Sequence, residues 1–142
     1  MTRYLLDTNI VSDLIRNPQG RIAAHIARVG EDTVCTSIIV ASELRYGVAK
    51  KGSPRLSAQV DAVLGALPIL NLEPDADTHY AALRTALEKA GTIVGANDML
   101  IAAHALAAGA VLVTDNAREF SRIEGLTQEN WLREEDGVTA AR

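Results

Sequence analysis

Residues 97–115 read NDMLIAAHALAAGAVLVTD, and this stretch decides the fold. Its first part, up to Ala108, is apolar almost all round the helical repeat, which predicts a helix buried at the centre of the molecule. Gly109 is a typical C-terminal stop for such a helix. The apolar run at 111–114 then predicts a buried strand, and Asp115 follows at the carboxyl end of that strand. A buried helix that leads into a buried strand favours an α/β protein with a parallel sheet.

The rest of the chain shows the same alternation of short apolar runs and longer amphipathic stretches. Strands are predicted at 4–6, 33–36, 69–72 and near Trp131, and helices at 8–17, 19–29, 38–50, 53–67 and 74–89, with a short helical turn after Asn116. We therefore predict an α/β fold in which a parallel central sheet is flanked by helices. In such folds the functional site lies beyond the carboxyl ends of the strands.

Length and cysteine content narrow the class of protein. The 142 residues match a single domain, which we place at 1–132, followed by a polar C-terminal tail at 133–142. The one cysteine, Cys35, excludes an internal disulfide framework. The longest uncharged stretch, 99–114, is shorter than the roughly 20 residues of a membrane-spanning helix, and the N-terminus lacks the pattern of a secretion signal. We therefore expect a cytoplasmic protein.

Four acidic residues stand where the predicted fold can bring them together. Asp7 and Asp115 follow predicted strands, Glu43 lies on an otherwise apolar helix face, and Asp98 sits in the first turn of the central helix. Each also has a purely structural interpretation. Asp7 can cap a helix and Asp98 can complement a helix dipole. Glu43 can be an ordinary helix residue, and Asp115 can belong to a turn.

Carboxylates that share one pocket repel one another. Either their pKa values rise and protons neutralise them, or cations do so. Oxygen ligands suit magnesium or manganese, and such an ion lowers the pKa of a bound water and neutralises a phosphate oxygen. The net charge of −4 gives no support to nucleic-acid binding, so that function must rest on a local site. The residues alone therefore predict an oxygen-ligated metal site on an α/β sheet.

Four stretches in a fixed order carry a more specific signal. They are Leu-Asp-Thr-Asn at 6–9, Ser-Glu-Leu-Arg-Tyr-Gly at 42–47, Asn-Asp-Met-Leu-Ile-Ala-Ala at 97–103 and Thr-Asp-Asn at 114–116. With these stretches the sequence resembles the PIN-domain family and, within it, the VapC-type toxin ribonucleases. One departure is at 93–95, where Ile-Val-Gly stands in place of the family's frequent Pro-Ile-Gly.

The resemblance implies the roles of individual residues. It makes Asp7 and Asp98 direct metal ligands, and it gives Glu43 and Asp115 the binding of a second ion or the orientation of the attacking water. Thr8, Asn9 and Thr114 match the polar residues around the family's acids. All four acids are therefore expected to be both catalytic and metal-binding.

The resemblance also implies an activity and partners. It implies a magnesium-dependent (or manganese-dependent) endoribonuclease that hydrolyses RNA phosphodiester bonds, acts as the toxin of a toxin-antitoxin pair with a cognate antitoxin, and forms a homodimer. Two other functions stay open from the residues. One is a metal-dependent nuclease or phosphoesterase acting on DNA or other phosphate esters. The other is a catalytically silent module whose acidic pocket holds a partner protein.

Overall fold

The computed structural model describes residues 1–133, so the predicted tail at 133–142 lies outside the described residues except for Arg133. Five strands form one sheet in the order β3-β2-β1-β4-β5, and every pair of neighbours is parallel. The strands are β1 (Tyr4–Leu6), β2 (Val34–Ser37), β3 (Ile69–Leu70), β4 (Val111–Val113) and β5 (Gln128–Glu129). The α/β fold with a parallel central sheet is therefore confirmed.

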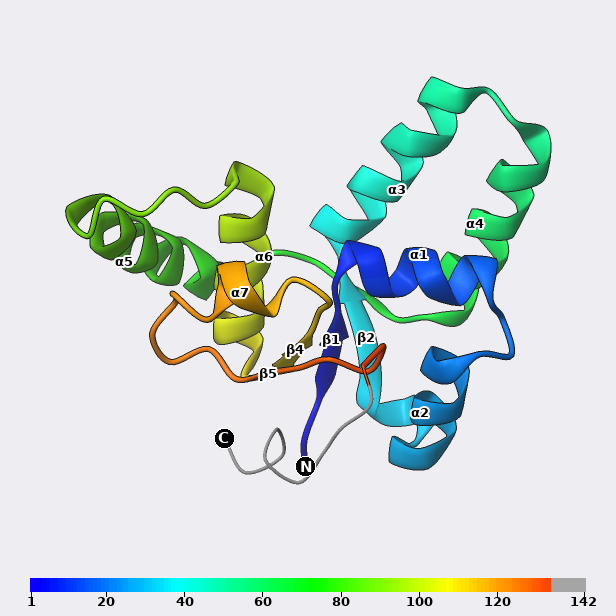
Figure 1. The fold of residues 1–142 in the computed structure, drawn as a ribbon, viewed down its shortest axis with the longest axis horizontal. Helices are drawn as coiled ribbons and strands as arrows, with labels where there is room; N and C mark the ends of the chain where they lie inside the picture. The colour runs from blue at the N-terminus through cyan, green and yellow to red at the C-terminus, as the bar shows by residue number, and fades with distance from the viewer. Residues whose placement is uncertain (134–142) are drawn as a thin grey trace.

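Helices cover the sheet on both sides (Figure 1). On one side lie α1 (Thr8–Arg16), α2 (Arg21–Val29), α3 (Ile38–Lys51) and α4 (Pro54–Ala66), and on the other α5 (Asp75–Lys89), α6 (Ala96–Ala108) and the short α7 (Ala117–Phe120). A 3₁₀ turn, η1 (Glu31–Thr33), leads into β2. None of the helices in the described part of the chain is long and apolar enough to cross a bilayer.

The core lies where the central strands meet α6 and α1. Leu5 and Leu112 are adjacent partners in the β1–β4 register and are fully buried, as is Ile101 on α6. Burial of such side chains contributes about 1.5–3 kcal/mol each and is the main force that holds the layers together. The prediction of a central buried helix from residues 97–108 is confirmed, because every residue from Met99 to Ala105 except the partly exposed Leu100 is buried. Since no charged side chain lies in that run, α6 can occupy the interior.

Two predicted strands differ from those in the structure. The strand predicted at 69–72 ends at Leu70, because its only neighbour is β2, and β2 gives way to α3 directly after Ser37. The last strand was expected near Trp131 but lies at Gln128–Glu129. Trp131 itself is buried against other side chains beyond the end of that strand. Elsewhere the predicted bounds agree with the structure to within one or two residues.

Gly109 ends α6 in the left-handed conformation, with a φ of 64°, and a Cβ there would meet no heavy atom within 4 Å. Gly109→Ala should therefore lower the free energy of unfolding by about 1 kcal/mol through backbone strain alone. Gly65 near the end of α4 is the matched control, since it has equal space and no positive φ. Gly65→Ala should stabilise the protein by about 0.5–1 kcal/mol. Urea denaturation measures both, and equal effects from the two changes would contradict the backbone argument.

An acidic cluster at the carboxyl end of the sheet

Asp7 is the residue at which β1 turns into α1. Its backbone N–H donates to the carbonyl of Val113 at 2.8 Å, so the turn is fixed to the neighbouring strand. One carboxylate oxygen accepts from the backbone N–H of Thr8 at 2.8 Å and the other from the hydroxyl of Thr114 at 2.7 Å. Burial raises the pKa of Asp7, and these two hydrogen bonds oppose that rise. Asp7 therefore caps α1, as its structural interpretation predicted, and is also a buried carboxylate.

Glu43 lies on α3 and links three helices. One of its oxygens accepts from the hydroxyl of Thr8 on α1, and the other accepts from the side-chain amide of Asn97 on α6 at 3.1 Å. With both oxygens held, the carboxylate has a defined orientation at the end of the sheet. Thr8 and Asn97 thus position a charged group instead of serving only their own helices.

Asp98, in the first turn of α6, has the most strongly altered acidity in the cluster. Its side chain is half-buried, and burial is the largest cause that raises the pKa of Asp98 to about 8. A hydrogen bond with Glu119 and the charges of Asp7, Glu119 and Glu43 raise it further. Side chains from β1, α3, α6 and α7 therefore repel one another at a single place. At neutral pH the metal-free site relieves that repulsion by keeping a proton on Asp98.

Glu119 on α7 is a member of this cluster that the sequence analysis missed. It faces Asp98, and it accepts a hydrogen bond of 3.4 Å from the side-chain amide of Asn116. The local signal at Glu119 is its capping-box spacing from Asn116, and that spacing predicts a helix start but not the approach of Glu119 to Asp98.

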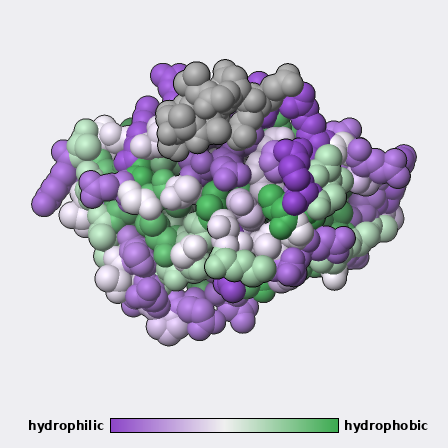
Figure 2. Space-filling view, turned by 90° about the horizontal axis from the view of Figure 1, so that it is seen from below, coloured by the Kyte–Doolittle hydropathy of each residue, from purple (hydrophilic) through white to green (hydrophobic). Residues whose placement is uncertain are grey.

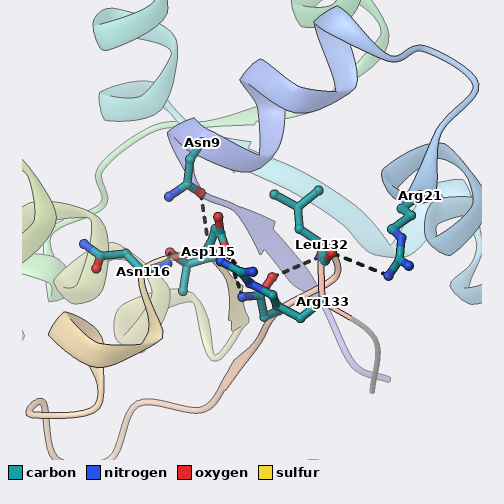
Figure 3. A network of polar contacts seen from close by, with 8 residues as sticks. Asn9, Arg21, Asp115, Asn116, Leu132 and Arg133 are labelled. Atoms are coloured by element: carbon teal, nitrogen blue, oxygen red, sulfur yellow. Dashed lines mark hydrogen bonds and ion pairs between the residues drawn. The ribbon is translucent and has the colours of Figure 1, made fainter. Parts of the chain in front are cut away.

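Asp115 follows β4, and its side chain lies beside Arg133 (Figure 3). Its Oδ1 atom accepts from the side-chain amide of Asn130 at 2.9 Å and from Nε of Arg133 at 3.2 Å. Its backbone N–H donates to the side chain of Asn9 at 3.2 Å. The structure thus brings Asp7, Glu43 and Asp98 together with Glu119, and places Asp115 at the edge of the cluster beside the C-terminal segment.

The donor chemistry of the cluster fits a hard divalent cation. Every candidate ligand is a carboxylate oxygen, which magnesium and manganese prefer. Within residues 1–133 no group of three or more His, Cys, Asp or Glu side chains already stands in an arrangement that could hold an ion. The charges of three other carboxylates nevertheless raise the pKa of Asp98, so positive charge at this place would relieve a repulsion that the fold imposes.

A parallel α/β sheet with carboxylates gathered at its carboxyl end is an architecture suited to metal-assisted hydrolysis. The family model of the PIN domain matches residues 4–126. The chain is 41% identical to ribonuclease VapC2 of Rickettsia felis over 130 residues, which are 90% of this chain and 97% of the relative. It is 33% identical to the tRNA(fMet)-specific endonuclease VapC of Shigella flexneri over 132 residues, covering 92% and 99% of the two chains.

A solved structure extends the likeness to three dimensions. The relative is a chain in the crystal structure of VapBC2 from Rickettsia felis bound to a DNA fragment from their promoter. The two chains superpose with a TM-score of 0.86 and are 38% identical in sequence, over 92% of this chain and 99% of the other. The chain therefore belongs to the PIN-domain family and, within it, to the VapC ribonucleases. As a member of this family it is a nuclease, and the resemblance predicted from the four motif stretches is confirmed.

Proposed function

We propose that this protein is a magnesium-dependent endoribonuclease that hydrolyses phosphodiester bonds in RNA and acts as the toxin of a toxin-antitoxin pair. The observation that carries the proposal is the convergence of Asp7, Glu43, Asp98 and Glu119 at a partly buried place, where burial and the neighbouring carboxylates raise the pKa of Asp98 to about 8. A fold tolerates such repulsion where the carboxylates serve a function, since apolar residues would pack there without an electrostatic cost.

We assign each acidic residue a role in metal binding or catalysis according to its contacts. Asp7 and Asp98 would bind the metal directly, and Glu43, fixed by Thr8 and Asn97, would hold its carboxylate ready for a second ion or for the attacking water. Asp115 shares that second role from the edge of the cluster. When bound, magnesium would supply a water of lowered pKa and neutralise charge on the phosphate.

The substrate we propose is a structured RNA of the tRNA type. This is supported by the name of the Shigella relative, which specifies a tRNA endonuclease. We further propose a cognate antitoxin as the protein partner, in line with the VapBC assembly of the solved relative, and a homodimer of this chain acting in the cytoplasm through a domain at 1–132.

The test is cleavage of purified tRNA by the purified protein with magnesium. We expect cleavage that stops when the metal is chelated, returns when magnesium is restored, and is lost in Asp7→Asn. Glu124→Gln is the control, because Glu124 is an exposed acid outside the cluster and its loss should change nothing.

Other outcomes decide between the alternatives. Cleavage of DNA alone would replace RNA as the substrate. The catalytically silent binding module would be favoured by two results together. Calorimetry would show no divalent-ion binding by the wild-type protein, and the protein would cleave no phosphate ester.

A further inference from the structure

A polar cavity opens beside the acidic cluster, between α1, the start of α2 and the C-terminal segment that follows β5. Its volume is about 410 Å³, and its lining includes Asp13, Asn17, Arg21, Asp115 and Arg133. Asp115 directly follows Thr114, whose hydroxyl donates to Asp7, so the cavity adjoins the chain segment that leads to the cluster. The size lies within the range of small-ligand pockets, about 300–1,000 Å³, and is sufficient for one nucleotide.

The charges in this cavity leave one cation unmatched. Asp115 is paired with Arg133 at 3.2 Å, and Asp13 is paired with Arg16 at 3.8 Å. Arg21 has no carboxylate within ion-pair distance among the described residues. Its one hydrogen bond within residues 1–133, from Nη1 to the carbonyl of Leu132, is long at 3.5 Å. Figure 3 shows this guanidinium reaching from α2 toward Leu132 of the C-terminal segment, with Asp115 on the far side of Leu132 in that view.

We propose that this cavity is a subsite for the RNA strand next to the bond that is cut, and that Arg21 binds a backbone phosphate there. The proposal rests on the proposed function, because it takes RNA as the substrate. A guanidinium presents several N–H donors in a planar fork that matches a phosphate, and it keeps its charge at every physiological pH. Within residues 1–133 Arg21 has no ion pair that would have to break for it to bind an anion.

Because the chain carries a net negative charge, RNA binding needs a local cation that contacts a phosphate. The net charge is −4, and four of the acidic residues counted in it are gathered at the place where the RNA must approach. Figure 2 shows one face of the molecule, where hydrophilic and hydrophobic residues are interspersed and neither covers the face. Because nucleic-acid affinity comes largely from phosphate contacts, a few well-placed cations must supply it here. Arg21 is one such cation, and it lines the same cavity as Asp115.

The experiment compares Arg21→Gln with Arg28→Gln in tRNA cleavage at two salt concentrations. Arg28 is the matched control, because it is an exposed arginine in the last turn of the same helix and outside the cavity. For Arg21→Gln we expect KM to rise about tenfold with kcat changed less than twofold, and the slope of log KM against log salt to fall by about one ion. Arg21→Lys should recover part of the loss, since it restores the charge without the fork.

A binding assay separates this proposal from the proposed function. Fluorescence anisotropy measures tRNA affinity in the Asp98→Asn background with and without Arg21→Gln, so no cleavage is required. A tenfold loss of affinity supports the subsite even if the wild-type protein cuts no RNA. An unchanged affinity, or a loss equal to that of Arg28→Gln, overturns it. The proposed RNA subsite is also overturned if Arg21→Gln leaves RNA affinity intact but weakens binding of an acidic antitoxin segment. That result would assign the cavity to the protein partner.

Discussion

Asp98→Asn should reduce RNA cleavage by roughly 10³-fold, the order of loss when one electrostatic element of a preorganised site is removed. Asparagine keeps the size and one oxygen of the aspartate but removes the negative charge that would hold a divalent cation. The measurement is kcat for tRNA with saturating magnesium. The matched control is Asp77→Asn, which alters an exposed acid in the first turn of α5 and should leave kcat unchanged.

The same substitution should stabilise the metal-free protein at alkaline pH. The pKa of Asp98 is raised to about 8 in the folded state, whereas in the unfolded chain it is near 4. Between these values the folded state holds more protons, so the free energy of unfolding falls as pH rises through this window. Because the side chain is half-exposed, screening limits the effect to about 1–2 kcal/mol.

The predicted fall in stability with rising pH can be measured by thermal unfolding. Wild-type and Asp98→Asn protein are compared at pH 5.5 and pH 8.5 without metal. The wild-type protein should lose stability between the two values, and the variant should lose less. Magnesium should then raise the melting temperature of the wild-type protein and have little effect on the variant. A variant that is less stable than wild type at pH 8.5 would contradict the account of Asp98 as a repelled carboxylate.

Trp131→Ala should lower the free energy of unfolding by about 3–5 kcal/mol, the usual range for a buried tryptophan. Trp131 is 2% exposed and lies five residues past the end of the PIN-domain match. Its ring stacks on His25 with centroids 4.5 Å apart, and lies 5.3 Å from the ring of Tyr4. It thereby joins α2, β1 and the C-terminal segment.

Trp131→Phe is the control, because it keeps an aromatic ring against His25 and loses only the hydrogen bond of 2.9 Å to Glu129 and part of the volume. Urea denaturation should show a loss of about 1–2 kcal/mol for phenylalanine. If alanine costs no more than phenylalanine, the segment does not stabilise the fold. Since Asn130 and Arg133 flank Trp131 and hold Asp115, the alanine variant should also alter the environment of Asp115.

The sequence was most informative where local pattern and burial agree. The stretch at 97–115 predicts both α6 and β4, because a helix that is apolar almost all round and a β-branched run both favour the interior. Asp7 and Asp98 were singled out since each stands at a strand end or in the first turn of a buried helix. The positions of these residues follow from local chemistry.

The rest of the site depends on contacts between distant parts of the chain. Glu119 joins Asp98 only because α7 packs beside the start of α6, and no local spacing fixes that approach. Asp115 faces Asn130 and Arg133 because β5 adds to the sheet next to β4. A two-residue strand is too short to produce a periodic pattern, so neither its position nor the side chains it brings to Asp115 could be predicted.

The two edge strands of the described sheet are too short to pair with a strand of another molecule. Both outer strands, β3 and β5, contain only two residues. Such short borders offer too few open amide and carbonyl groups for another molecule to continue the ladder, which guards against fibrous aggregation. If copies of this chain associate, these short edges favour contact through helical surfaces, which leaves the strand ends that Asp7 and Asp115 follow undisturbed.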